Sequence, residues 1–264
     1  MERSFRFVSI GVATLAMLAG CDQATVERGI EVEIDAVSTT PAQRCADGVS
    51  TGSEGQSFCT AAGERVDLIN GLAAPFPVRA LTCPSALALL SKALGAIIPA
   101  AMAHGGHITA PPGAIDVAEP AGTAWTLGEL PLAPGRYCGV ELSLEQLPAS
   151  TFTAAVPPPH DDILLYTRPC HFPNPAPEPP ASSHRCYTVP VRGAPASVEL
   201  AFPEPIALDT QTRSLHVEVA IDFATWFDGI DFATLETDPL QQQALLQNVI
   251  DSLRIARAAT GAAP

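Results

Sequence analysis

Proline is the residue type that most limits what this chain can fold into. The sequence has 26 prolines among 264 residues, which is roughly twice the usual share. Proline has no backbone N–H to donate and fixes φ, so it interrupts helices and is excluded from the middle of a sheet. Because 47% of the residues are hydrophobic, there is enough apolar material for a packed core. We therefore expect a globular chain of short elements joined by ordered turns.

Alternating apolar and polar residues indicate several short strands. Residues 30–37 alternate between isoleucine or valine and acidic side chains, which is typical of a half-buried strand. Residues 214–223 show the same pattern, with His216 on the side that faces solvent. Residues 39–64 are polar and Gly-rich and are expected to form a loop. The remaining expected strands cover residues 66–72, 114–117, 123–128, 137–144, 162–166, 186–191 and 196–207. This spacing predicts a mostly β chain folded as an antiparallel β-sandwich, Ig-like or jelly-roll-like.

Two helices are expected beside the strands. Residues 85–103 are rich in Ala and Leu and predict an inserted, buried helix that breaks near Pro99. A membrane span is the alternative for this segment, but Lys92 and Pro99 weigh against it. A second helix is expected to begin after Asp238, which is a good capping residue. Its apolar stripe consists of Leu240, Ala244, Leu245, Ile250 and Leu253. Residues 30–264 are thus assigned to one β-sandwich domain with helical additions.

The N-terminal residues predict export and a lipid anchor. Two arginines precede an apolar run over residues 7–19, which is too short for an ordinary membrane-spanning helix. The run ends in Leu18-Ala19-Gly20-Cys21, which resembles the lipobox of bacterial lipoproteins. Residues 1–20 are therefore expected to be a signal peptide, Cys21 to carry lipid, and 21–29 to form a tether. The expected location is the bacterial cell envelope, with the protein anchored by lipid in the inner or outer membrane and facing the periplasm. A plain signal peptide with a chance cysteine is the alternative.

Cysteine usage fits the same compartment. Seven cysteines, less Cys21, leave an even set in an exported chain, and such a set predicts disulfides. We expect Cys45–Cys59 and Cys170–Cys186 because these pairs close local loops, and Cys83–Cys138 by elimination. Structural zinc is the alternative, but the sequence has no C-x2-C pair and its spacings match no structural zinc site.

Charge and motif content argue against several classes of function. The chain has 28 acidic and 14 basic residues and a net charge of −14, which opposes binding to the phosphates of nucleic acid. It lacks the H-E-x-x-H, P-loop and G-x-G-x-x-G motifs. Thiols joined in disulfides are also not available as nucleophiles. We therefore expect no nucleic acid partner and no enzymatic activity.

Histidines are the strongest candidates for ligand binding. His104 and His107 are separated by two glycines that allow a tight turn, so both imidazoles can converge on one metal ion. Copper or zinc suits such ligands. Two ligands rarely hold a metal firmly, and His160 and His216 are the candidates for completing the site. The alternative is a solvated histidine pair with no metal. A second alternative is processing after Ala101-Met102-Ala103, which would place His104 at a new N-terminus.

Short motifs spread over residues 100–235 carry a family resemblance. They are A-H-G-G-H at 103–107, T-L-G at 126–128, a strand with P-G-R-Y over 132–144, and T-W-F-D-G-I-D-F at 225–232. In these motifs the chain resembles the MbnP-like exported metal-associated lipoproteins. The resemblance implies a β-sandwich that binds copper in the periplasm through His104 and His107, with Trp125 or Trp226 as an aromatic neighbour. The cysteines of this chain depart from that pattern and leave the further ligands open. Core packing is the other interpretation of Trp226.

Two functions follow as hypotheses. The first is a lipid-anchored metal-binding protein, for copper or zinc, that acts in uptake, buffering or delivery to an envelope transporter or receptor. The second is a disulfide-stapled protein- or glycan-interaction module with no metal. Its motivation is the proline-rich segment between Cys170 and Cys186, because a rigid loop loses little entropy on binding. The flanking His171 and His184 are expected to be solvent-exposed.

Overall fold

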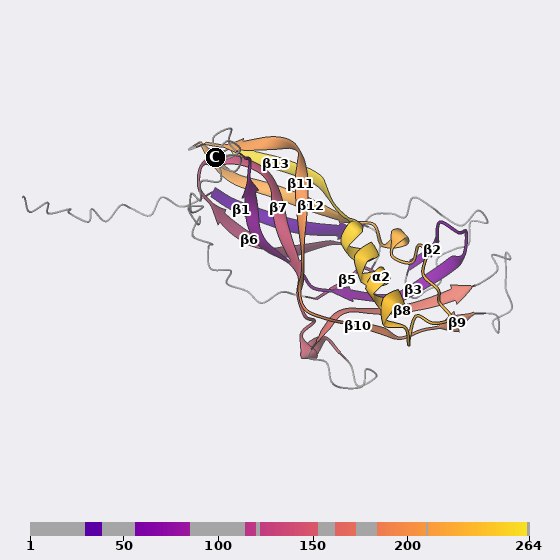
Figure 1. Cartoon of the computed structure of the whole chain (residues 1–264). Coiled ribbons are helices and arrows are strands. Elements are labelled where there is room, and N and C mark those ends of the chain that lie inside the picture. The colour runs from indigo at the N-terminus through magenta and orange to yellow at the C-terminus, as the bar shows by residue number, and fades with distance from the viewer. Residues whose placement is uncertain are drawn as a thin grey trace, which may run out of the picture.

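Strands account for most of the structure, which is a computed structural model that describes residues 30–38, 56–84, 114–119, 122–152, 162–172, 184–209 and 211–262 (Figure 1). In chain order the strands are β1 (Ile30–Ser38), β2 (Gln56–Cys59), β3 (Arg65–Ala73), β4 (Pro75–Thr82), β5 (Ile115–Asp116), β6 (Ala124–Leu132), β7 (Gly135–Leu144), β8 (Ile163–Phe172), β9 (Arg185–Cys186), β10 (Val189–Arg192), β11 (Ala196–Leu208), β12 (Thr212–Ile221) and β13 (Leu253–Ala262). The helical elements are the 3-10 turns η1 (Ala149–Thr151) and η2 (Phe223–Thr225) and the helix α2 (Pro239–Asp251). The expected mostly β chain with a C-terminal helix is confirmed.

The strands form three sheets. Sheet A has the order β13-β12-β1-β6, and sheet C has the order β11-β7-β4. Sheet B has the order β10-β8-β3-β2, with β5 beside β3 and β9 beside β8. Only Ala74 separates β3 from β4, so the chain passes directly from sheet B into sheet C at this residue. At the sheet edges, β4 lies beside β6 and β11 lies beside β13.

One strand pairing differs from the expected antiparallel arrangement. Among the described strands, all pairs are antiparallel except that β1 runs parallel to β12, with Val32 opposite Leu215 and Ile34 opposite Val217. The two strands are far apart in the sequence, so no hairpin turn fixes their relative direction. A pattern of alternating residues predicts which side chains are buried but contains no information about the direction of the neighbouring strand.

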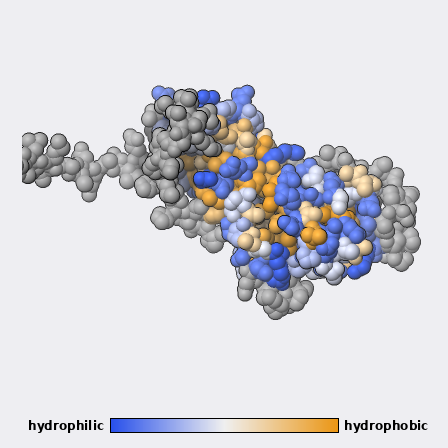
Figure 2. Space-filling model, in the orientation of Figure 1, coloured by the Kyte–Doolittle hydropathy of each residue, from blue (hydrophilic) through white to orange (hydrophobic). Residues whose placement is uncertain are grey.

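The expected burial of the alternating residues in β1 and β12 is confirmed. Ile30, Val32 and Ile34 are buried in β1, and Leu215, Val217, Val219 and Ile221 are buried in β12. These side chains belong to one apolar cluster that includes residues of all three sheets and of α2. Its largest fully buried members are Trp226, Phe58, Phe223 and Phe227. Figure 2 shows hydrophilic residues over much of α2, beside apolar residues near the strand ends.

Three strands were not expected from the sequence. Strand β2 lies inside the segment expected as a loop, and β4 contains Pro75 and Pro77. Among the described strands, β4 pairs with β7 alone and lies at the edge of its sheet, so its other edge needs no N–H donors and the prolines fit. Strand β13 begins at Leu253, which we expected in the helix stripe. The helix α2 ends at Asp251, its Leu245 and Val249 are buried, and its Leu240 is exposed.

Two of the expected disulfides are present. Cys83 is bonded to Cys138, and Cys170 is bonded to Cys186. Cys59 is also disulfide-bonded, and its expected partner Cys45 lies outside the described residues. The expected signal peptide, the tether and the inserted helix over 85–103 lie outside them as well. In the described part of the chain, no helix is long and apolar enough to cross a membrane.

Candidate functional site

The structure describes only one of the four histidines expected to bind metal. His104, His107 and His160 lie outside the described residues. His216 is on the solvent side of β12, as expected, with 40% of its side chain exposed. Its Nδ1 lies 3.5 Å from Glu33 Oε2, and its Nε2 lies 3.8 Å from Asp35 Oδ2. Within the described ranges, no group of three or more His, Cys, Asp or Glu side chains is arranged to hold a metal ion.

A pocket lies instead at the end of sheet B that carries the Cys170–Cys186 disulfide. Its volume is about 340 Å³. Three segments that are distant in the sequence supply its walls: the β2–β3 turn, the β8–β9 pair and the loop after η2. The lining residues are Glu64, His171, Arg185, Tyr187, Ile230, Asp231, Phe232 and Ala233.

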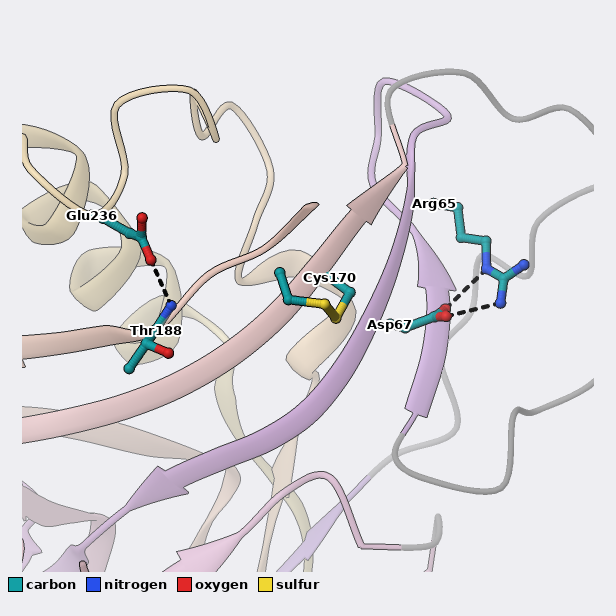
Figure 3. The surroundings of a disulfide bond; sticks show 6 residues. Arg65, Asp67, Cys170, Thr188 and Glu236 are labelled. Carbon is teal, nitrogen blue, oxygen red and sulfur yellow. Dashed lines mark hydrogen bonds and ion pairs between the residues drawn. A yellow bond between two sulfur atoms is a disulfide. The ribbon is translucent and has the colours of Figure 1, made fainter. Parts of the chain in front are cut away.

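The β8–β9 pair positions two of these residues. Cys170 is directly opposite Cys186, and His171 is directly opposite Arg185. The disulfide therefore links the two strands one residue away from both pocket side chains. Figure 3 shows the disulfide between two polar pairs, Arg65 with Asp67 and Glu236 with Thr188.

The β2–β3 turn positions Glu64. The Thr60 N–H donates to the Glu64 carbonyl at 2.9 Å, and the Gly63 N–H donates to the Thr60 carbonyl at 2.8 Å. Gly63 has a φ of 80°, a conformation that glycine adopts without strain. In addition, the Ala61 N–H donates to Asp228 Oδ1 at 2.7 Å. This last bond joins the turn to the loop that forms the opposite wall of the pocket.

The loop after η2 is held by its own carboxylate and by α2. Asp231 Oδ1 accepts from the Ala233 N–H at 2.9 Å, and its Oδ2 accepts from the Thr234 hydroxyl at 3.1 Å. From α2, Gln241 Oε1 accepts from the Asp231 N–H at 2.8 Å. Asn248 of α2 donates to the carbonyls of Trp226 and Asp228 at 2.9 and 3.0 Å. Hydrogen bonds from α2 thus fix the position of the loop that lines the pocket.

Aromatic rings form the inner wall. The His171 ring is parallel to the Phe232 ring, with centroids 4.0 Å apart. Phe232 also lies 5.7 Å from the Tyr187 ring and 5.6 Å from the buried Phe227 ring. Only 11% of the His171 side chain is exposed. The expectation that His171 is solvated is therefore wrong, whereas His184 is exposed and stacks on Phe172.

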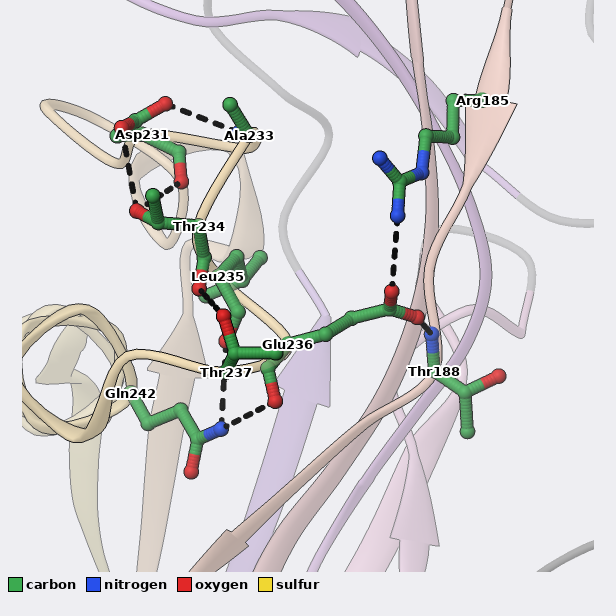
Figure 4. A network of polar contacts seen from close by, with 9 residues as sticks. All are labelled: Arg185, Thr188, Asp231, Ala233, Thr234, Leu235, Glu236, Thr237 and Gln242. Atoms are coloured by element: carbon green, nitrogen blue, oxygen red, sulfur yellow. Dashed lines mark hydrogen bonds and ion pairs between the residues drawn. The ribbon is translucent and has the colours of Figure 1, made fainter.

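Charged groups surround this wall. The Arg185 guanidinium lies over the Tyr187 ring, 4.9 Å from its centroid, and 3.2 Å from Glu236 Oε2. Glu236 Oε1 accepts from the Thr188 N–H at 2.9 Å, and its carbonyl accepts from Gln242 at 3.2 Å (Figure 4). Burial raises the pKa of the Tyr187 phenol above its usual value; Arg185 opposes that rise, while Glu236 and Asp231 add to it. The phenol is therefore neutral at physiological pH.

The His171 imidazole faces a carboxylate without forming a hydrogen bond. Its Nε2 lies 3.2 Å from Glu64 Oε2, but this buried nitrogen has no hydrogen-bond partner among the described residues. The Glu64 side chain is itself 36% exposed and faces the pocket. The pocket thus offers an accessible carboxylate beside aromatic surfaces, an arrangement that can bind a ligand.

The two tryptophans expected near a metal have different surroundings. Trp226 is fully buried, and its indole N–H donates to Ser252 Oγ at 2.9 Å. Its interpretation as a core residue is therefore confirmed. Trp125 is partly buried against the same core.

Comparisons with known protein families, with curated proteins and with solved structures gave no match to this chain.

Proposed function

We propose that this chain is an exported, lipid-anchored binding module whose ligand site is the pocket at the end of sheet B. The observation that carries the proposal is the convergence of three separate segments on one pocket. The Cys170–Cys186 disulfide joins two of the pocket-bearing strands, and α2 holds the third segment through Asn248. Because the residues of such a site are already held in place before the ligand arrives, the site loses little conformational entropy on binding.

The scaffold we propose for this module is a β-sandwich of sheets A and C. The contacts of β4 with β6 and of β11 with β13 bring the edges of the two sheets together. The buried faces of β1 and β12 point into a shared apolar cluster with β7. Sheet B extends to one side of sheets A and C (Figure 1), and the pocket lies at the end of sheet B.

The proposed location is the bacterial cell envelope, facing the periplasm. It rests on the apolar run and on the sequence ending at Cys21, which resembles a lipobox. A protein anchored there by lipid meets envelope receptors, transporters and envelope glycans, which are the candidate partners. A Cys21→Ser variant is expected to lose membrane association, as measured by fractionation of cell envelopes.

We also propose that the module is not an enzyme. Residues 48–52 have the letters of the G-x-S-x-G motif, which in serine hydrolases follows a strand and opens a helix. Here the preceding residues 39–47 are mostly polar and contain no apolar run that predicts such a strand. The pocket supplies charge, hydrogen-bonding groups and stacking surfaces, which together suit recognition of a ligand.

The test of the pocket is a substitution that fills it. Ala233 is exposed and lines the pocket, so Ala233→Trp places a large ring in the space without removing a core contact. Ala194→Trp is the matched control, because Ala194 is exposed in the bend between β10 and β11. Binding of the full chain to panels of peptides and glycans should be lost with Ala233→Trp and kept with Ala194→Trp. Equal binding by the two variants would overturn the proposal.

Metal binding is a separate proposal that rests on the sequence alone. The His104 and His107 pair is expected to bind copper or zinc, and each imidazole must be neutral to do so. Affinity should therefore fall steeply below about pH 6. Titration of the protein and of its His104→Ala/His107→Ala variant tests this expectation. If both proteins bind the metal alike, these two residues are not the ligands.

A further inference from the structure

The charges lining the pocket indicate what it binds. Glu64 and Asp231 are the lining carboxylates, and Arg185 is the lining residue with a permanent positive charge. Arg185 already has a partner, because its guanidinium lies 3.2 Å from Glu236. Negative charge is therefore in excess around the pocket. The net charge of −14 of the whole chain acts in the same direction.

Among the described residues, the Glu64 carboxylate has an ion-pair contact with His171 but no hydrogen-bond donor. The His171 Nε2 lies 3.2 Å from Glu64 Oε2, in a geometry that forms no hydrogen bond. An ammonium or guanidinium group in the pocket would supply the missing donor, and such charge-assisted bonds are the strong ones. An anionic ligand would instead face two carboxylates.

The apolar lining suits the rest of such a ligand. Ile230 and Ala233 offer aliphatic surface, while Tyr187 and Phe232 offer aromatic surface. Long cationic side chains place their methylene groups along surfaces of this kind and keep the charged end near water or a carboxylate. Aromatic rings also attract nearby cations. A pocket of about 340 Å³ has room for a group of this size.

We infer that this pocket binds an organic cation, namely an ammonium or guanidinium group carried on a short aliphatic chain. In this assignment Glu64 pairs with the cation, Asp231 adds negative potential, and Tyr187 and Phe232 contact the aliphatic part. The inference rests on the proposed function and specifies the ligand class of the same site.

The experiment titrates the full chain with small probes at pH 7. The cationic probes are N-acetyl-lysine methylamide, N-acetyl-arginine methylamide and the free diamine cadaverine. The neutral and acidic probes are N-acetyl-norleucine methylamide and N-acetyl-glutamate methylamide. Saturable binding is expected for the cations, and its absence is expected for the norleucine and glutamate probes. Preference for the capped amino acids over cadaverine would identify a peptide side chain as the source of the cation, and the reverse would identify a free amine.

Variants assign the effect to named residues. Glu64→Gln keeps the shape of the side chain and removes its charge, so it should weaken the cationic probes by roughly tenfold or more. Glu204→Gln is the control, because Glu204 is exposed on β11, and it should leave the affinity unchanged. Arg185→Gln should tighten cation binding, since it removes the lining positive charge that repels the ligand. This variant tests the inference in the opposite direction, so a general loss of structure cannot mimic both results.

Two results would overturn the inference. The first is norleucine binding as tightly as lysine, and the second is unchanged affinity in Glu64→Gln. Suppose that either result is found, and that Ala233→Trp still abolishes binding of a ligand from the peptide and glycan panels. The pocket then binds a ligand of another class, and the proposed function stands without this assignment. If Ala233→Trp excludes nothing from the panel, the proposed function itself fails.

Discussion

Ser252 is the residue that joins the end of α2 to the core. Its hydroxyl accepts from the Trp226 indole N–H at 2.9 Å and donates to the Val249 carbonyl at 2.6 Å, and all of these groups are buried. Ser252→Ala leaves the indole N–H without a partner, so it should lower the free energy of unfolding by about 1–3 kcal/mol. Urea denaturation measures this change. Ser197→Ala, at an exposed position of β11, should change it little, and equal effects would show that the buried hydrogen bond is unimportant.

Individual residues were predictable from the sequence where the reason is local. Asp238 was expected to cap α2, and its side chain accepts from the Leu240 N–H at 2.9 Å. His216 was expected to face solvent because its neighbours in β12 alternate. His171 was not predictable, because its burial depends on Phe232 and Glu64, which are distant in the sequence. The pocket consists of contacts of this second kind.

The β8–β9 pair is the element whose disulfide shapes the pocket. Cys170→Ser/Cys186→Ser removes a link across a sequence separation of 16 residues, so it should lower the free energy of unfolding by about 3 kcal/mol. Because His171 and Arg185 are adjacent to the two cysteines, ligand affinity should fall as well. Thermal denaturation measures the change in stability, and titration with a ligand recovered from the peptide and glycan panels measures the change in affinity.

The matched control removes the other described disulfide. The Cys83–Cys138 disulfide joins the segment after β4 to β7, away from the pocket, and spans a larger sequence separation of 55 residues. Cys83→Ser/Cys138→Ser removes this link. It should destabilise the protein while leaving ligand affinity unchanged. A similar loss of affinity in both double variants would mean that global stability, rather than the local link, controls the site.

Helices and strands were predictable from the sequence only where the residues of the element itself show a recognisable pattern. The alternation in β1 and β12 and the Asp-Pro start of α2 are such signals. Strand β4 has no such signal, because Pro75 and Pro77 argue against a strand unless its edge position is known. Strand β13 is rich in alanine and follows α2 directly, so its sequence resembles a continued helix. Which strands pair, and in which direction, depends on contacts that local patterns do not encode.

At the scale of the whole molecule, the three tyrosines predict a response to alkaline pH. Burial raises the pKa of Tyr137, Tyr166 and Tyr187 above the ordinary value. The folded protein therefore favours the neutral phenols, and this contribution to stability is complete below the pKa of tyrosine in the unfolded chain, about 10. It is lost as pH rises from there through the higher pKa values of the folded state.

The measurement is a pH titration of tyrosinate absorbance in folded and urea-unfolded protein. The folded protein should ionise at higher pH than the unfolded one, and its free energy of unfolding should decrease over the same range. Coincident titration curves would contradict the assignment of buried phenols, including that of Tyr187 in the pocket wall.

We propose that ligand binding takes place at the end of sheet B. Hydrogen–deuterium exchange of the full chain, with and without a ligand recovered from the peptide and glycan panels, tests it most directly. We predict that the ligand slows exchange in the segments that form the pocket walls, which are residues 60–65, 170–172, 184–188 and 230–233. Protection confined instead to the β1–β12 face, around Glu33, Asp35 and His216, would contradict the claim.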